Sequence, residues 1–434
     1  MRVKVVTVIG ATGTMGANVA GIFASFGDAK VYAVGRDIEK VKNTVPKIIK
    51  SVKSNSIAEN IIPADFSMLD DCISKSDLVS ESLVENMDIK IDIASRVAQV
   101  LKPDAISCTG TSGLSVTSLA EHYPENLRKN FFGVHMFNPP YNLPLCEIIP
   151  TKYSDAALTN ELSEYLRTVL FRTVVKVKDS PAFLGNRIGF QFINEAMQDA
   201  EKYKDNGGID YIDAILGPFT GRSMPPLITA DFVGLDIHKE IVDNIYQNTN
   251  DFAHDTFLLP HFLQNLIYEK KLGRKTDGGL YKSIKHMNGL KQHLVFDLNT
   301  GEYREKIPYV FPFVKEMKNY ISSGDYLNAF EILITNHSQE ADICLSFILK
   351  YLVYSLYTVR EIGFTIDAAD DVMATGFSWC PPLALFELLS SVADVEMLVK
   401  ERINAIYEKV DVRGLLSNVK PSNYDYRTFL KSTE

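Results

Sequence analysis

Residues 5–16 read VVTVIGATGTMG, an apolar run that breaks into a turn with three glycines and then into a helical pattern. Glycine lets the chain reverse tightly, lets its backbone approach a pyrophosphate, and lets the next helix pack closely on the strand. The N-terminus of that helix offers unpaired N–H groups and a positive dipole end to phosphates. The stretch therefore predicts a dinucleotide site built from Gly10, Gly13, Thr14, Met15 and Gly16.

The spacing of these glycines is G-x-x-G-x-x-G, which is longer than the usual G-x-G-x-x-G by the residue Thr12. A second strand-like run, KVYAV at 30–34, ends in Gly35-Arg36-Asp37, where an acid normally binds the ribose hydroxyls of NAD. Gly35 occupies that acid position, Arg36 could meet the 2′-phosphate of NADP, and Asp37 could turn back to the ribose. The sequence predicts NAD as cofactor, with NADP as the alternative.

Composition excludes several classes of protein. A chain of 434 residues with 46% hydrophobic residues predicts two or three domains with large cores. Its net charge of −9 argues against nucleic-acid binding, and the basic stretch 40–53 is interpreted as a solvated helix face, with contact to a phosphorylated substrate as the alternative. Five cysteines without C-x-x-C spacing indicate a reducing compartment and no metal site.

Nothing in the sequence indicates a membrane protein. The first apolar run passes straight into the glycine turn, so we expect no targeting leader. The longest apolar helical stretch, 347–359, contains Lys350 and is expected to be too short to span a bilayer. We therefore expect a cytoplasmic protein.

Short β-rich runs alternate with helical patterns from residue 1 to 178, at 3–9, 30–34, 77–79, 105–108, 133–135 and 173–177. Such alternation predicts an α/β Rossmann domain with a doubly wound parallel sheet. Ser180 and Pro181 then read as the N-cap and first residue of a helix. Apolar residues recur on one face of that helix at Leu184, Ile188, Phe192 and Ala196, and helices dominate from there onward.

The helical part contains a duplication. IDYIDAIL at 209–216 recurs as IDAADDVM at 366–373, and Pro-Pro-Leu follows each copy, at 225–227 and 381–383. We predict two related all-α domains, at 179–300 and 301–434. Residues 283–340 read as a linker region with a hairpin signal at 299–301. Two copies could satisfy one pairing surface within a single chain, so we expect a monomer, or else a homodimer.

His135 ends a predicted strand, and Glu147 lies on the next apolar run, beyond a Pro-rich loop. Two strands joined in this way could bring the side chains together. A carboxylate bonded to one imidazole nitrogen fixes the tautomer and leaves the other nitrogen as a proton acceptor. Alcohol oxidation requires such a base, because the hydroxyl proton must leave as hydride departs.

These motifs together resemble the (S)-3-hydroxyacyl-CoA dehydrogenase family, over nearly the whole chain and including the tandem helical repeat of its longer members. In that family a glycine-rich NAD turn precedes an H-F-F-N-P segment, a glutamate at this spacing, and an N-R pair that opens the helical domain. Those positions read His135-Met136-Phe137-Asn138-Pro139, Glu147 and Asn186-Arg187 here. Further matches are TGTSGL at 109–114, ENMDIK at 85–90 and LGRKTDGGLY at 272–281.

The resemblance implies a role for each matched residue. His135 would be the general base and Glu147 its orienting partner, with Ser112 and Asn186 binding the substrate oxygen and with Glu85 and Lys90 on the cofactor side. The implied substrate is an acyl-CoA thioester. The segment NPPYNLPL at 138–145 is also similar to the carnitine and gulonate dehydrogenases. A small free 3-hydroxy acid therefore stays an alternative substrate, and a non-catalytic dinucleotide-binding protein stays an alternative class.

Overall fold

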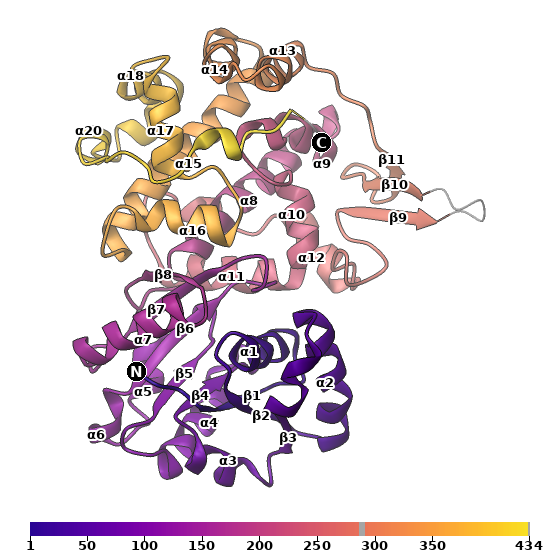
Figure 1. The fold of residues 1–434 in the computed structure, drawn as a ribbon. Helices are drawn as coiled ribbons and strands as arrows, with labels where there is room; N and C mark the ends of the chain where they lie inside the picture. The colour runs from indigo at the N-terminus through magenta and orange to yellow at the C-terminus, as the bar shows by residue number, and fades with distance from the viewer. Residues whose placement is uncertain (286–290, 433–434) are drawn as a thin grey trace. The chain divides into compact units, whose positions relative to one another are not determined.

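The computed structural model describes residues 1–285 and 291–432 and divides into two compact units (Figure 1). The first unit comprises Met1–Phe183 with Ile362–Phe364, and the second comprises Leu184–Glu361 with Thr365–Glu434. A mostly parallel sheet with helices forms the first unit, and helices form most of the second. The predicted fold class is confirmed.

Eight strands form the sheet of the first unit, in the order β3-β2-β1-β4-β5-β6-β7-β8. They are β1 (Val5–Ile9), β2 (Lys30–Gly35), β3 (Ile61–Asp65), β4 (Leu78–Glu81), β5 (Ile106–Thr109), β6 (Phe131–Met136), β7 (Leu145–Pro150) and β8 (Thr173–Lys176). The sequence analysis did not predict β3. The sheet is also not wholly parallel, because β7 pairs antiparallel with β6. The strand order reverses at β1 and β4, and ligands of such sheets bind at the carboxyl ends of the strands there.

Helices pack on this sheet because their apolar faces match its buried strands. Val6, Val8 and Val31 of the strands share one core cluster with Phe23 of α1 and Leu162 of α7. The helices of this unit are α1 (Thr14–Ser25), α2 (Ile38–Val52), α3 (Leu69–Lys75), α4 (Met87–Val100), α5 (Val116–Ala120), α6 (Glu125–Arg128) and α7 (Ala156–Thr168).

The second unit begins later than the sequence predicted. Ser180 and Pro181 do not start its first helix, because Ala182 and Phe183 adopt left-handed backbone angles, φ 58° and 56°, that end any helical turn there. The helices are α8 (Gly185–Lys202), α9 (Ile209–Ile215), α10 (Pro226–Val233), α11 (Leu235–Asn248), α12 (His261–Tyr268), α13 (Pro312–Ser322), α14 (Tyr326–Thr335), α15 (Gln339–Ile362), α16 (Ala368–Gly376), α17 (Pro382–Ser390), α18 (Val395–Arg402), α19 (Asn404–Tyr407) and α20 (Val412–Leu416).

The two copies of the repeated motif make the same contact. Asp213 of α9 accepts a hydrogen bond from the backbone N–H of Leu227 at 2.8 Å, at the start of α10. Asp370 of α16 accepts the equivalent bond from Leu383 at 2.7 Å, at the start of α17. Each acid thus binds the first turn of the helix that its Pro-Pro-Leu begins, which explains why acid and Pro-Pro-Leu recur together.

The region expected to be a linker, 283–340, is folded instead. It holds most of a three-stranded antiparallel sheet, β9 (Tyr281–Lys285), β10 (Lys291–Phe296) and β11 (Tyr303–Glu305), followed by α13 and α14. The predicted hairpin is confirmed, since β10 pairs antiparallel with β11 across a turn that contains Gly301.

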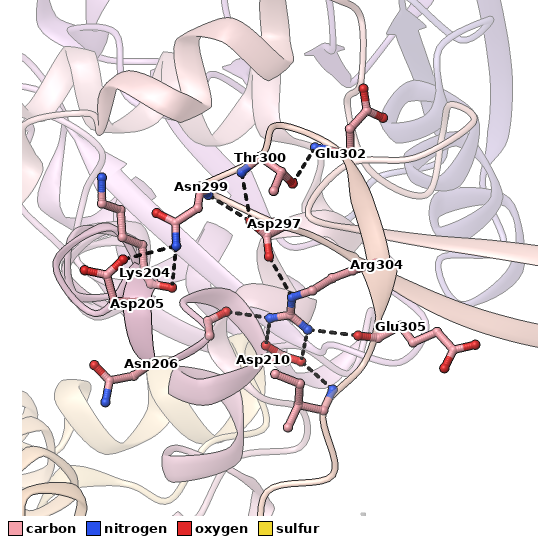
Figure 2. Close-up of polar contacts among 12 residues, drawn as sticks. Lys204, Asp205, Asn206, Asp210, Asp297, Asn299, Thr300, Glu302, Arg304 and Glu305 are labelled. Carbon is pink, nitrogen blue, oxygen red and sulfur yellow. Dashed lines mark hydrogen bonds and ion pairs between the residues drawn. The ribbon is translucent and has the colours of Figure 1, made fainter.

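A buried ion pair fixes this small sheet to the first helical repeat. Figure 2 shows Arg304 of β11 between Asp210 of α9 and Asp297. Its nitrogens lie 2.6 Å from Asp210 Oδ1 and 3.0 Å from Asp297 Oδ2. The Asp210 side chain is 0% exposed, and its Oδ2 also accepts the N–H of Ile307. The ion pair therefore fixes the small sheet to α9, in a region where the sequence predicted a linker.

Helix α15 runs for 24 residues and is longer than the apolar stretch that the sequence suggested. By length and composition alone it is the one helix, among the residues described, that could cross a membrane. Within the protein, 78% of its apolar window is buried, as in the core helix of a folded domain.

Candidate functional site

The structure brings His135 and Glu147 together. β6 and β7 are antiparallel neighbours, and their register sets the two residues directly opposite each other. His135 Nδ1 lies 2.7 Å from Glu147 Oε2, and the two side chains are 6% and 0% exposed. An ionised carboxylate can only accept, so Nδ1 carries the proton and Nε2 is left as a proton acceptor.

The loop that carries Ser112 follows β5 at the same edge of the sheet. β5 runs parallel to β6 with Thr109 opposite Gly133, so the segment after Thr109 emerges beside the end of β6. Glu85 Oε1 accepts the backbone N–H of Ser112 at 2.8 Å and that of Gly113 at 3.1 Å. Glu85, expected on the cofactor side, thus holds the loop that carries Ser112.

Lys90 is enclosed by carboxylates. Its side chain is 1% exposed, and its Nζ lies 2.8 Å from Glu81 Oε1 and 3.6 Å from Glu85 Oε2. Glu81 also accepts the hydroxyl of Thr109 at 2.7 Å. Lys90 therefore fixes the two glutamates, and through Glu85 it fixes the Ser112 loop.

Glu81 is a site residue that the sequence analysis missed. It is the last residue of β4 and is buried, although it carries a carboxyl group. A signal was available, because an acid that ends a buried parallel strand lies where ligands of such sheets bind. The neighbouring ENMDIK motif drew attention to Glu85 instead.

The glycine turn has the geometry that a pyrophosphate needs. Gly10 has φ +92°, and a Cβ there would lie 2.3 Å from the carbonyl oxygen of Ser82. A Cβ at Gly16 would lie 2.3 Å from the carbonyl oxygen of Gly10. Gly13, the N-cap of α1, has no side chain to bond the first N–H groups, at Thr14 and Met15, which are open to a phosphate.

The end of β2 departs from the usual ribose site. A Cβ at Gly35 would lie 2.7 Å from a methyl group of Val41 and 2.8 Å from that of Thr12, so an acid at this position would require these side chains to move. Asp37 caps α2, where its Oδ1 accepts the N–H groups of Glu39 and Lys40 at 2.9 and 3.3 Å. Arg36 is exposed between them.

Asn186 lies in the first turn of α8 and is buried. Its neighbour Arg187 forms an ion pair with Asp251 at 2.7 Å and bonds the hydroxyl of Tyr354 at 3.2 Å, which fixes the start of this helix. Asn186 belongs to the second compact unit, and its role beside His135 stays a prediction.

Tyr141 of the NPPY segment packs on α1. Its hydroxyl donates to the carbonyl of Asn18 at 3.1 Å, and a Cβ at Gly21 would lie 2.2 Å from that hydroxyl. Burial raises its pKa to about 12, so it stays a neutral donor. Tyr141 therefore fixes its loop to the helix after the glycine turn. This role is structural, so the presence of Tyr141 does not by itself indicate a free-acid substrate.

An open glycine turn and a buried histidine held by a carboxylate at one sheet edge are typical of a dinucleotide-dependent dehydrogenase. The sequence profile of the 3-hydroxyacyl-CoA dehydrogenase NAD binding domain matches residues 5–180, and that of the family's C-terminal domain matches residues 183–283. A probable 3-hydroxyacyl-CoA dehydrogenase from Deinococcus radiodurans is 32% identical over 300 residues, which cover 66% of this chain and 84% of that protein. The chain belongs to the 3-hydroxyacyl-CoA dehydrogenase family, and its first unit is the NAD-binding domain.

Longer relatives extend the similarity. A probable 3-hydroxyacyl-CoA dehydrogenase from Bacillus subtilis is 28% identical over 82% of this chain, but the chain spans only 43% of that protein. The solved 3-hydroxybutyryl-CoA dehydrogenase of Escherichia coli K12 has a TM-score of 0.68 at 18% identity, and covers 96% of this chain and 99% of its own. The two chains therefore share their fold over nearly their whole length.

Proposed function

We propose that this chain interconverts (S)-3-hydroxyacyl-CoA and 3-ketoacyl-CoA with a nicotinamide dinucleotide as hydride carrier. The observation that supports this most directly is the buried pair of His135 and Glu147, set opposite each other on β6 and β7. It supplies an oriented base at the sheet edge where the glycine turn also lies. Family membership supplies the substrate class.

In the oxidation, Nε2 of His135 takes the proton of the substrate hydroxyl as the C3–H bond breaks. A nicotinamide dinucleotide held on the glycine turn would supply the hydride acceptor. Glu147 holds the Nδ1 proton and stabilises the imidazolium that forms. In the reverse direction the imidazolium returns its proton, while the hydroxyl of Ser112 donates a hydrogen bond to the forming alkoxide.

The test is oxidation of reduced cofactor by purified protein with acetoacetyl-CoA, with ethyl acetoacetate as the control without CoA. Turnover of the thioester alone supports the proposal. Turnover of small 3-hydroxy acids in its place would assign the chain to the free-acid alternative. Cofactor binding without any turnover would indicate a non-catalytic protein.

Location and assembly are further proposals from the sequence: a cytoplasmic protein that is monomeric because its two helical repeats satisfy one pairing surface internally. The shared contacts of Asp213 and Asp370 support a duplication. Sedimentation should give a monomer at low concentration, and a stable dimer there would contradict the idea.

A further inference from the structure

An open hollow lies beside the end of β2, and none of the chemistry above uses it. It has a volume of about 390 Å³ and is lined by Thr12, Arg36, Asp37 and Lys40. These residues come from the glycine turn, the segment after β2 and the first turn of α2. A dinucleotide on the glycine turn extends its adenosine ribose toward this end of β2.

The hollow carries net positive charge. Arg36 and Lys40 are exposed, and neither has an ion-pair partner within the part of the chain that the structure describes. By contrast, Lys42 of the same helix is paired with Glu39 at 2.7 Å. Asp37 is the one acid among the lining residues, and its Oδ1 already accepts two backbone N–H groups.

The carboxylate that would reject a phosphate here is missing, and neighbouring side chains crowd its position. Sites selective for NAD place a carboxylate at the end of β2, where it binds the ribose hydroxyls and repels a 2′-phosphate. Here that position is Gly35, and Val41 together with the extra turn residue Thr12 fills the space of any side chain. The extra turn residue Thr12 therefore lies where an acid at position 35 would place its Cβ.

We propose that this hollow binds the 2′-phosphate of NADP(H), so that the chain binds NADP(H) more tightly than NAD(H). The guanidinium of Arg36 matches a phosphate with two parallel donors, Lys40 adds a second charge, and the hydroxyl of Thr12 adds a neutral donor. The proposal rests on the proposed function only in requiring a nicotinamide dinucleotide on the glycine turn.

The test is equilibrium titration of the full chain with NADPH and with NADH, followed by fluorescence of the reduced nicotinamide. Arg36→Ala should weaken NADPH binding by about 10- to 100-fold, the range for losing a charge-assisted hydrogen bond, and leave NADH binding unchanged. Lys42→Ala is the matched control, since it removes a cation outside the hollow, and it should change neither affinity. Tighter binding of NADH than of NADPH by the unmodified chain would overturn the proposal.

Asp37→Asn tests whether Asp37 only caps α2 or also binds the ribose of NAD. Asparagine caps a helix as well as aspartate does, so the variant removes the charge and keeps the fold. It should tighten NADPH binding and leave NADH binding unchanged. Weaker NADH binding in this variant would identify Asp37 as a ribose ligand of an NAD site and overturn the proposal.

Both NADP and CoA carry a phosphorylated adenosine, so the hollow could bind the phosphate of either ligand. Two adenosine bisphosphates distinguish these ligands. We expect 2′,5′-ADP to displace NADPH from the unmodified chain and 3′,5′-ADP to do so at least 10-fold less well, about 1.4 kcal/mol. Equal displacement by both would contradict a 2′-phosphate site. NADPH binding without turnover of acetoacetyl-CoA would leave this inference standing and refute the proposed function, whereas turnover with NADH and no NADPH binding would do the reverse.

Discussion

Buried acids of the helical unit accept hydrogen bonds from that unit's own groups, whereas the sheet edge of the first unit keeps polar atoms open. Asp231, for example, accepts the N–H groups of Leu280 and Tyr281 at 2.8 and 2.7 Å and is 4% exposed. At the sheet edge, the first N–H groups of α1 have no cap and Arg36 is exposed.

The two regions differ in how many hydrogen-bonding atoms of their polar groups already have partners within the protein. This number distinguishes groups that stabilise the fold from groups that can bind a ligand. A buried group whose hydrogen-bonding atoms all have partners within its unit stabilises the fold and has no capacity left for a ligand. A group that is held on one side and open on the other, such as the imidazole of His135, is ready for chemistry. Substitutions in the two units should therefore change different measured quantities.

The largest effect is expected for His135→Gln. Loss of the general base should lower kcat by about 10²- to 10⁴-fold, while the cofactor dissociation constant and the unfolding free energy stay unchanged. Steady-state kinetics and cofactor titration measure this. His122→Gln, which changes an exposed histidine of the same unit, is the control. Near-full turnover of His135→Gln would show that another group is the base.

Asp210→Asn tests the helical unit. It leaves the Arg304 guanidinium, 22% exposed, without its main partner, and should lower the unfolding free energy by about 3 kcal/mol. Urea denaturation measures the change. Asp205→Asn removes an exposed acid from the same network in Figure 2 and should cost far less. Equal losses in the two variants would mean that burial of the pair is unimportant.

Glu147→Gln is expected to have a smaller effect on kcat than loss of the base itself. The amide oxygen can still accept from His135 Nδ1, but its neutral charge stabilises the imidazolium less, so kcat should fall about 10- to 100-fold. KM and the melting temperature should change little. A lower melting temperature with normal kcat would instead assign Glu147 a structural role.

The smallest effect concerns pH. Burial raises the pKa of Asp370 to about 7 from an ordinary value of 3.8. Between these values the folded state holds a proton that the unfolded state has released, so stability falls as pH rises from about 4 to 7. Asp370→Asn should reduce this fall by at least about 1.4 kcal/mol, the equivalent of one pKa unit, because the amide that replaces the carboxyl group does not titrate in this range. An unchanged slope of stability against pH in this variant would contradict the assignment.

Much of the fold and part of the site followed from local pattern. The glycine turn, most strands and the hairpin before Gly301 were predicted because each depends on residues close together in the chain. The start of α8 was predicted wrongly, since the left-handed angles at Ala182 and Phe183 have no sequence signal in those residue types. The linker prediction failed because the Asp210–Arg304 pair joins segments far apart in the chain.

The sequence by itself determined a Rossmann domain followed by helical repeats, the glycine turn between its first strand and helix, and the histidine and glutamate on successive strands. Periodicity and spacing encode these features directly. Only the tertiary structure decided that Lys90 is enclosed by Glu81 and Glu85, and that Thr12 and Val41 close the acid position at Gly35. Strand register and helix packing set such contacts, and they bring together residues whose distance along the chain carries no information about their distance in space.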